Sequence, residues 1–345
     1  MIKQLGLDVL VVQEMLDQAG VNQFLNKIMN YSVPGTYAAA PFFDGPDTDN
    51  ALFYKKSATS LIFRKQIPTD LRDISEYVLK VKSGPGKGTV FRIYSIHLKA
   101  GTSSADKKAR ENEAKILRNY LNGLQPKSLF LVCGDLNLYS SREAAFQVLI
   151  GNQADNDGRA NDPVNKPGIW HDRSIFANIH TQSTRTTSFG GGATGGLDDR
   201  FDMILISDAL LTSTKLVYVP RSYIAYGNDG KHFNKAVNSG VNSSVSPEIA
   251  YALWQASDHL PVVIELLPQT GGIPKAPSNL TAKSISSSEI NLTWKDNSNN
   301  ETGFKIERQT TSNWTQIAKA STNTTTYSNS GLSYLSTYSY RVKSF

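Results

Sequence analysis

The stretch Leu129-Phe-Leu-Val-Cys-Gly-Asp135-Leu-Asn137 decides the fold class, because an apolar run ends there in an acid and an amide two positions apart. The run has the length and the residue types of a buried strand. In extended backbone, residues two positions apart lie on one face, so the side chains of Asp135 and Asn137 would project together. The stretch therefore predicts a buried strand with polar groups at its carboxyl end.

Four further segments share this design, in which an apolar strand begins or ends in a group that binds hard cations or moves protons. They are Val9-Leu-Val-Val-Gln-Glu14, Ile93-Tyr-Ser-Ile-His97, Arg200-Phe-Asp202-Met-Ile-Leu-Ile and Ala256-Ser-Asp258-His259-Leu-Pro. Each motif alone has an ordinary structural explanation: a solvated glutamate, a packed histidine, or a turn pair. Because all five occur in one α/β region, we favour a shared functional site.

The patterning around these motifs predicts an α/β domain. Apolar positions at helical spacing predict a helix over Ser104–Leu124, and a capping residue predicts another after Ser141. Long polar stretches predict surface loops at 151–168, 181–196 and 226–247. The predicted strands are Val9–Gln13, Leu52–Tyr54, Leu61–Arg64, Ile74–Val81, Val90–Leu98, Leu129–Cys133, Met203–Ile206 and Val262–Leu266.

A length of 345 residues suits one large domain and one small domain. The segment Pro268–Pro277 contains three prolines and two glycines, which is typical of a linker. We therefore expect a first domain over 1–267, a linker over 268–276 and a second domain over 277–345. No apolar run approaches the length of a membrane span.

The formal net charge of +6 is unevenly divided. From Ile273 onward, eight Lys and Arg oppose four acids, so the first 272 residues carry only +2. Charge alone therefore gives little support for a polyanionic substrate. The single cysteine, Cys133, lies inside an apolar strand and is interpreted as a buried structural thiol. The Gly190–Gly196 cluster lies in a predicted loop and is interpreted as flexible punctuation.

The ordered series Gln-Glu, Ser-Ile-His-Leu-Lys, Gly-Asp-Leu-Asn, Arg-Phe-Asp and Ser-Asp-His-Leu-Pro resembles the motifs of the endonuclease/exonuclease/phosphatase (DNase I-like) superfamily. The resemblance covers about residues 5–267. It implies an α/β (α+β) fold, a four-layer sandwich of two mostly antiparallel sheets flanked by helices, with the active site at one rim. It also implies a hydrolase that cleaves phosphodiester bonds.

By this resemblance, Glu14 is the principal ligand of Mg²⁺, with Asp258 nearby; Mn²⁺ or Ca²⁺ are alternative ions. His259 would lie at the scissile phosphate and be oriented by Asp202. The chemistry agrees, because Mg²⁺ is commonly held by one or two carboxylates together with substrate phosphate. A histidine paired with a carboxylate is held in one tautomer, and its protonated form is stabilised.

The resemblance gives the remaining motifs roles at the same phosphate. Asp135 and Asn137 would position or activate the water and contact phosphate or metal. His97, which occurs in the nuclease and sphingomyelinase branches, would donate to a phosphate oxygen. Nothing in this scheme needs a covalent nucleophile, and no glycine-rich phosphate loop in a strand–helix context is present.

A Mg²⁺-dependent nuclease is the leading functional hypothesis, and nucleic acid is the expected partner. A phosphoesterase for lipid headgroups or other small phosphodiesters is the alternative within the enzyme class. A non-catalytic binding or adhesion protein is the alternative outside it. The segment Arg221–Lys235, with its aromatic and basic residues, is a candidate grip for a polynucleotide, although a solvated loop is the simpler interpretation. We expect a monomer.

The region over about 275–345 resembles a fibronectin type III module, in which Trp294 would be the core tryptophan and Tyr338 the corner tyrosine. Such a module implies a spacer or a surface that binds polysaccharide or protein, and it carries no expected chemistry. In bacterial enzymes it commonly accompanies secretion, so we expect an extracellular protein. The first residues contain no apolar signal-peptide core.

One departure from the family pattern concerns the ends of the sequence. The family begins one strand earlier, with a strand that ends in Asn beside the metal, and this sequence opens at what resembles the helix after that strand. We therefore expect the first strand of the first domain, and the last strand of the fibronectin-like module, to be missing. We also expect activity to depend on restoring the first strand.

Overall fold

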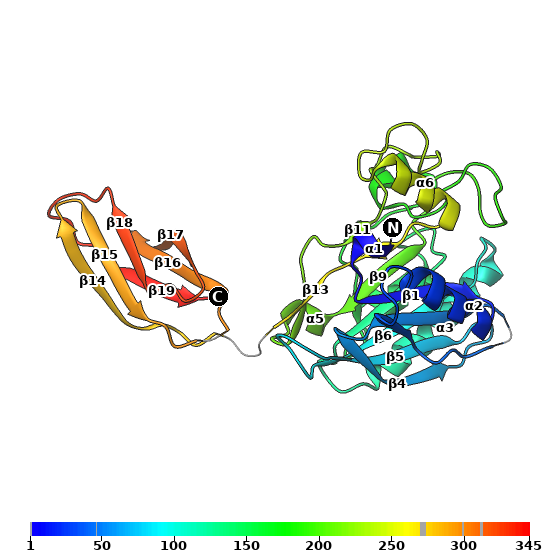
Figure 1. Ribbon diagram of the computed structural model, residues 1–345, viewed down its shortest axis with the longest axis horizontal. Coiled ribbons are helices and arrows are strands. Elements are labelled where there is room, and N and C mark those ends of the chain that lie inside the picture. Colours follow the sequence, from blue (N-terminus) through cyan, green and yellow to red (C-terminus); the bar gives the residue numbers. More distant parts are fainter. Residues whose placement is uncertain (1, 46, 270–273, 299, 311–312) are drawn as a thin grey trace. The chain divides into compact units, whose positions relative to one another are not determined.

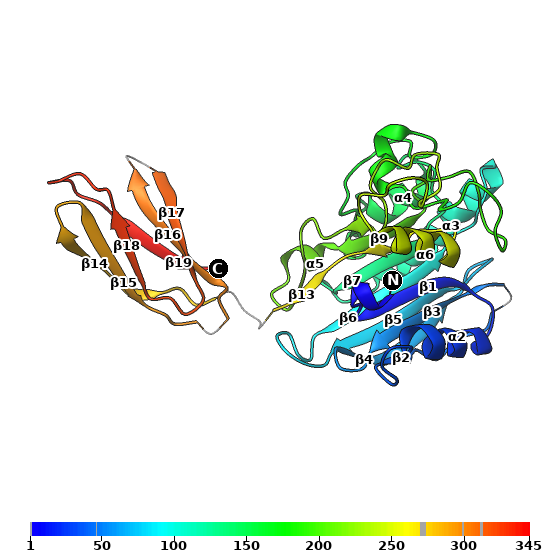
Figure 2. The ribbon, with the colours of Figure 1, turned by 45° about the horizontal axis from the view of Figure 1, so that its top comes forward.

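The computed structural model describes residues 2–45, 47–269, 274–298, 300–310 and 313–345. They form two compact units, Met1–Pro268 and Gln269–Phe345, drawn in Figure 1 and Figure 2. Residues 270–273 of the predicted linker lie outside the described residues. None of the helices in the described part of the chain has the length and apolarity needed to cross a membrane.

The first unit is built around a six-stranded sheet of order β4-β5-β6-β7-β9-β8. Its β6–β7 pair is parallel, and the other neighbours are antiparallel. The parallel pair is possible because a helix connects the two strands. The strands are β4 (Thr59–Ile67), β5 (Ile74–Val81), β6 (Val90–His97), β7 (Phe130–Asp135), β8 (Ala160–Asn161) and β9 (Asp202–Ser207).

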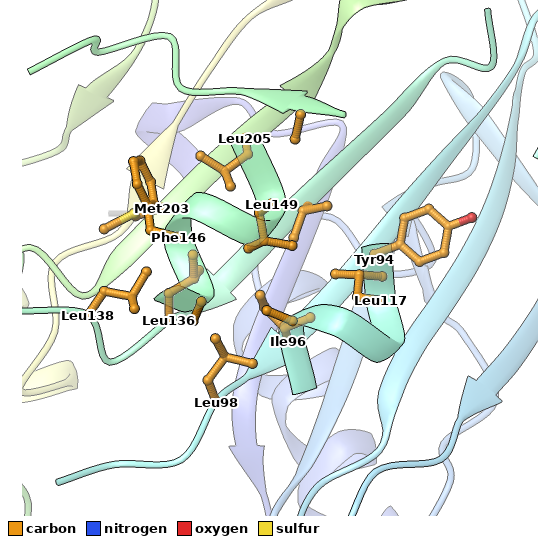
Figure 3. Packing of buried hydrophobic residues seen from close by; sticks show 14 of the residues in the cluster. Tyr94, Ile96, Leu98, Leu117, Leu136, Leu138, Phe146, Leu149, Met203 and Leu205 are labelled. Carbon is orange, nitrogen blue, oxygen red and sulfur yellow. The ribbon is translucent and has the colours of Figure 1, made fainter. Parts of the chain in front are cut away.

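Two helices, α3 (Ser104–Asn122) and α4 (Ala144–Ile150), cover one face of this sheet. A capping box between Ser103 and Asp106 begins α3, as its sequence favours. The apolar stripes of both helices pack onto the alternate inward residues of the strands. Figure 3 shows this core, with Leu117 of α3 and Phe146 and Leu149 of α4 gathered against the strands.

A second sheet of order β1-β3-β2 contributes to the core on the other face. Its strands are β1 (Val9–Met15), β2 (Tyr37–Ala39) and β3 (Asp49–Lys55). Helix α2 (Gln18–Phe24) and the π-helix η1 (Leu25–Met29) pack onto its outer face through Val21 and Met29. The layers are therefore helix, sheet, sheet and helix, and the predicted four-layer fold class is confirmed.

Two small strand pairs and four short helical segments complete the first unit. β10 pairs with β13, and β11 pairs with β12. The segments are β10 (Leu216–Tyr218), β11 (Ile224–Ala225), β12 (Val262–Val263), β13 (Leu266–Pro268), α1 (Ile2–Leu5), η2 (Ser174–Ile179), α5 (Asp208–Thr212) and α6 (Pro247–Ala256).

Two segments in the last part of the first unit differ from the sequence-based prediction. The single strand predicted over Val262–Leu266 is divided into β12 and β13, because the two pieces pair with different partners. The predicted loop that ended at Pro247 is followed by α6, which the pattern did not reveal. Ser246 caps this helix and Pro247 occupies its first turn, where the missing N–H costs nothing.

The second unit is an all-β sandwich of two three-stranded sheets, β14-β15-β18 and β17-β16-β19. Trp294 is buried in its core with Leu292, Phe304 and Ile306. The hydroxyl of Tyr338 accepts a hydrogen bond from the Ser333 N–H at 2.9 Å, the geometry expected of a corner tyrosine. The strands are β14 (Ser278–Ser286), β15 (Glu289–Lys295), β16 (Gly303–Thr310), β17 (Asn313–Ser321), β18 (Thr326–Ser330) and β19 (Tyr340–Ser344).

Candidate active site

Strand register brings three predicted site residues to one end of the central sheet. His97 ends β6 and lies opposite Asp135, which ends β7. Asp135 lies in turn opposite Asp202, which begins β9. Partner positions in a sheet have neighbouring side chains on the same face. The row across β6, β7 and β9 therefore places an imidazole and two carboxylates side by side.

His259 reaches this row from the loop before β12. Its Nδ1 lies 2.7 Å from Asp202 Oδ2, and its Nε2 lies 4.0 Å from Asp135 Oδ2. Burial alone would lower the pKa of His259. The charge and hydrogen bond of Asp202, with the charges of Asp135 and Asp258, outweigh burial and raise the pKa to about 10. His259 is therefore an imidazolium at neutral pH.

Asp135 is held in an environment that opposes its ionisation. Burial raises its pKa to about 7, and the neighbouring charges of Asp202 and Glu14 act in the same direction. The N–H of Asn137 donates to Asp135 Oδ1 at 2.8 Å, and the Asn137 amide donates to the Leu98 carbonyl at 3.1 Å. Asp135 and Asn137 therefore lie together, as the sequence predicts, and these two hydrogen bonds fix their side chains.

His97 has a different environment from His259. It is buried, and burial together with the positive charges of Arg72 and His259 lowers its pKa to about 4. Its Nε2 lies 3.6 Å from Asp135 Oδ2, which is longer than a hydrogen bond. Its Nδ1 is buried and has no partner within the described residues. His97 is therefore a neutral imidazole with hydrogen-bonding capacity left over for a ligand.

The two predicted metal ligands lie at the edge of this cluster rather than inside it. Glu14 is exposed at a bulge of β1, where its backbone is left-handed with φ 63°, and its charge raises the pKa of Asp135. Asp258 precedes His259, and its carboxylate accepts the Ala193 N–H at 2.6 Å. A Cβ at Gly192 would lie 2.8 Å from that carboxylate. A side chain at Gly192 would therefore crowd the Asp258 carboxylate, and the interpretation of the cluster as flexible punctuation stays a prediction.

The rim carries oxygen donors of the kind that a hard divalent cation takes. Glu14, Asp135, Asp202 and Asp258 lie around it, although among the described residues no three of their ligand atoms come within 4.8 Å of one another. Burial is the main cause of the raised pKa of Asp135, with the charges of Asp202 and Glu14 adding to it, and a nearby cation would favour the ionised form. Oxygen ligands of this kind are those that Mg²⁺ prefers. Glu14 and Asp258 would contribute exposed or partly exposed carboxylates to such an ion.

A second acidic group lies near the same rim. His171, Asp198 and Asp199 form the group of possible metal ligands in the described residues whose ligand atoms all lie within 4.8 Å of one another. His171 Nδ1 lies 2.9 Å from Asp199 Oδ1, and burial raises the pKa of Asp199 to about 6. These residues were not predicted from the sequence, because none of them lies at the end of a predicted strand.

Two further polar residues of the site were also missed. The terminal amide of Gln182 lies 2.6 Å from His259 Nε2, on the side of the ring opposite Asp202, and because a protonated Nε2 can only donate, the amide oxygen faces it in the imidazolium state. Arg72 forms an ion pair with Asp47 at 3.0 Å, and its buried Nη1 has no partner within the described residues. Gln182 was missed because it belongs to a loop whose path depends on tertiary pairing. Arg72 was missed because only acids, amides and histidines at strand ends were taken as candidates.

The aromatic residues of the candidate polynucleotide grip over Arg221–Lys235 are half-buried. The Tyr223 hydroxyl is buried, and Arg200 lies over its ring. Phe233 packs against His180 with ring centroids 5.9 Å apart. These contacts favour the simpler interpretation, a surface loop held by its own side chains.

An apolar cavity of about 690 Å³ lies between β1 and the segment Leu260–Leu266. The strands beside it have free edges, since β1 pairs with β3, and β12 pairs with β11, each on one side within the described residues. Cys133 lines this cavity as a buried free thiol, and burial raises its pKa to about 12. The prediction of an inert structural cysteine agrees with this environment.

Comparison with known proteins gives two family matches. Residues 1–259 match the model described as the Endonuclease/Exonuclease/phosphatase family, and residues 275–345 match the fibronectin type III domain. No curated protein matches the chain.

Several solved structures are similar to the first unit. A D. rerio TDP2 humanized by 14 mutations is 14% identical, with a TM-score of 0.50 over 77% of this chain and 88% of that chain. The human Nocturnin catalytic domain with bound sulfate is 18% identical, with a TM-score of 0.44 over 77% of this chain and 83% of that chain. The Staphylococcus aureus beta toxin is 14% identical, with a TM-score of 0.42 over 75% and 86%. The first likeness shows a shared fold.

Proposed function

The chain belongs to the endonuclease/exonuclease/phosphatase family, and on that premise we propose that its first unit is a metal-dependent phosphodiesterase whose substrate is nucleic acid. The observation that carries the proposal is the pairing of His259 with Asp202 at 2.7 Å, beside the row that joins His97 and Asp135. The pKa values of the neighbouring His259 and Asp135 are both raised from their ordinary values. Shifted pKa values in neighbouring groups are typical of sites for acid–base catalysis.

The first step assigned to these residues is the activation of water. Asp135, with a pKa of about 7, accepts a proton from the attacking water, and Asn137 helps to hold that water. The water oxygen forms a bond to phosphorus as the bond to the leaving oxygen breaks. A pKa near neutrality suits Asp135 to this work, because the carboxyl is partly ionised at neutral pH and still basic enough to accept a proton.

The second step is the protonation of the leaving group. His259, an imidazolium at neutral pH, donates its Nε2 proton to the leaving oxygen, and Asp202 stabilises the charge and orientation of the ring. The products are a phosphate monoester and an alcohol, with one proton gained by Asp135 and one lost by His259. His97 donates a hydrogen bond from its neutral imidazole to a non-bridging phosphate oxygen.

A bound Mg²⁺ would supply neutralisation of the charge that develops on the phosphate. Glu14 and Asp258 would hold it, with waters and substrate oxygens completing its coordination. The group of His171, Asp198 and Asp199 is a competing location for the ion. Metal titration by calorimetry distinguishes the two, since Glu14→Gln should weaken binding and Asp199→Asn should not.

The substrate is tested by offering plasmid DNA, RNA and sphingomyelin, each with Mg²⁺ and with EDTA. Cleavage of either nucleic acid that EDTA stops supports the proposal. Cleavage of sphingomyelin alone would replace the nuclease by a lipid phosphoesterase. Absence of any hydrolysis, with the metal shown to be bound, would favour a non-catalytic binding protein.

We also propose that the protein acts outside the cell, on the strength of its pairing with a fibronectin type III module. The module would serve as a spacer or as a surface for polysaccharide or protein. Immunodetection in culture medium and in cell lysate tests the location, and detection in the lysate alone would contradict it.

A further inference from the structure

Three aromatic side chains stand in a row close to the candidate active site. Phe189 and Trp254 have ring centroids 4.6 Å apart, and Trp254 and Tyr251 have centroids 5.9 Å apart with planes inclined by 13°. Phe189 comes from the glycine-rich loop, while Tyr251 and Trp254 lie one turn apart on α6. We call these three residues the aromatic row.

The ends of the aromatic row are open. Phe189 is 42% exposed and Tyr251 is 51% exposed, and Trp254 lies between them, partly buried. Helix α6 buries its opposite face through Ile249 and Leu253. Large apolar rings left open in a cluster, rather than singly, are typical of binding surfaces.

The row is rigidly held by a buried arginine. Arg185 is 5% exposed and donates to the carbonyls of Trp254 at 2.7 Å, Phe189 at 3.0 Å and Gln255 at 3.0 Å. Its guanidinium also lies over the rings of Phe189 and Trp254, at 5.2 and 6.0 Å from their centroids. These bonds join the loop to the carboxyl end of α6, so the row is already formed without a ligand.

The row is also tied directly to the catalytic rim. Thr184 N–H donates to the Asp258 carbonyl at 3.0 Å, and Ala193 N–H donates to the Asp258 carboxylate at 2.6 Å, so both ends of the loop that carries Phe189 are fixed there. Trp254 precedes Asp258 by four residues, a path that spans about 14 Å at most. A ligand whose phosphate lies at His259 therefore has its flanking groups within reach of the rings.

Resting on the phosphodiesterase proposed above, we infer that the aromatic row stacks an unpaired nucleobase next to the scissile phosphate, which makes single-stranded nucleic acid the preferred substrate class. Aromatic faces stack on any base, whereas paired bases in a duplex are already stacked on one another. The chemistry at the edge of the row suits a base better than an acyl chain. Gln255 is exposed there, and its amide donates to the Tyr251 hydroxyl at 3.2 Å.

The test is calorimetric binding in the full chain carrying His259→Ala with Mg²⁺, so that the strand stays intact. A short oligothymidylate should bind more tightly than an abasic strand of the same length, and more tightly than its duplex. Tyr251→Ala and Phe189→Ala should each weaken oligothymidylate binding by about 5- to 150-fold and leave the abasic strand unaffected. Tyr251→Phe should retain the wild-type affinity, because the ring is kept.

The matched control is Tyr31→Ala, which removes an 81% exposed tyrosine from the first unit outside the row. This variant should bind both the oligothymidylate and the abasic strand with unchanged affinity. Equal binding of the oligothymidylate and the abasic strand, or unchanged binding by Tyr251→Ala and Phe189→Ala, would overturn the inference. If Tyr251→Ala and Phe189→Ala lose binding to sphingomyelin vesicles while their oligothymidylate binding stays intact, the aromatic row is a lipid-binding surface and the inference is overturned.

The proposed phosphodiesterase activity is measured separately, as cleavage of the abasic strand by the wild-type chain. If that strand is cut and the Tyr251→Ala variant binds oligothymidylate normally, the aromatic row fails while the phosphodiesterase stands. If no strand is cut and the row still discriminates bases from abasic sugar-phosphate, the binding surface stands and the catalytic assignment fails.

Discussion

At the scale of single residues, the site gives two neighbouring ionisable groups, His259 and Asp135, different protonation states. His259 is held protonated by Asp202, whereas burial and nearby negative charge hold Asp135 close to half-ionised at neutral pH. The separation follows from position alone, because Asp202 accepts a hydrogen bond from the imidazole while Asp135 stays 4.0 Å from it. Asp202, which contacts the imidazole, raises the pKa of His259, whereas Asp135, which lacks that contact, stays basic enough to accept a proton.

Asp202→Asn should lower activity on single-stranded DNA by about 10²- to 10⁴-fold, because the leaving group loses its proton donor. Since the pair raises the folded pKa of His259, its stabilisation is present below the unfolded pKa of about 6.5 and is lost as the pH rises through about 10. The difference in unfolding free energy between wild type and variant should shrink over that window. Urea unfolding at several pH values measures it, and a difference that grows with pH would contradict the pairing; exposed Asp157→Asn is the control.

Asp135→Asn should abolish activity and yet stabilise the protein at high pH. The folded pKa of Asp135 is raised to about 7, so the stability of the wild type falls as the pH rises from the unfolded pKa of about 3.9 to about 7, and a neutral amide avoids this loss. In EDTA, the advantage of the variant over the wild type in urea should therefore be larger at pH 9 than at pH 5. Lower resistance of the variant at pH 9 would show that the carboxylate is stabilised by partners that outweigh its burial.

At the scale of secondary structure, strand ends made the site predictable and loops did not. His97, Asp135 and Asp202 could be placed together because apolar strands predict where extended backbone stops, and register then aligns the ends. Gln182 could not be placed, because backbone pairing with His259, far away in sequence, fixes its loop. Helix α2 escaped prediction since Gly20 interrupts its pattern.

The buried pair of Arg110 and Glu143 couples helix α3 to the loop that follows His97. The Arg110 guanidinium is fully buried, bonds Glu143 at 2.6 Å, and donates to the carbonyls of Lys99 and Gly101. Glu143→Ala should cost about 3–5 kcal/mol of unfolding free energy, because it leaves a buried charge without its partner. Urea unfolding measures the loss. Glu111→Gln, which removes an exposed pair from the same helix, should have little effect, and equal losses would argue against a special role of burial.

At the scale of the whole molecule, the two units have separate hydrophobic cores. The chemistry-bearing residues all belong to Met1–Pro268, and the second unit contributes a small sandwich around Trp294. Removing 269–345 should therefore leave kcat/KM for a short single strand within about twofold of the full chain, since no catalytic group is lost. A larger fall would mean that the second unit takes part in binding the strand.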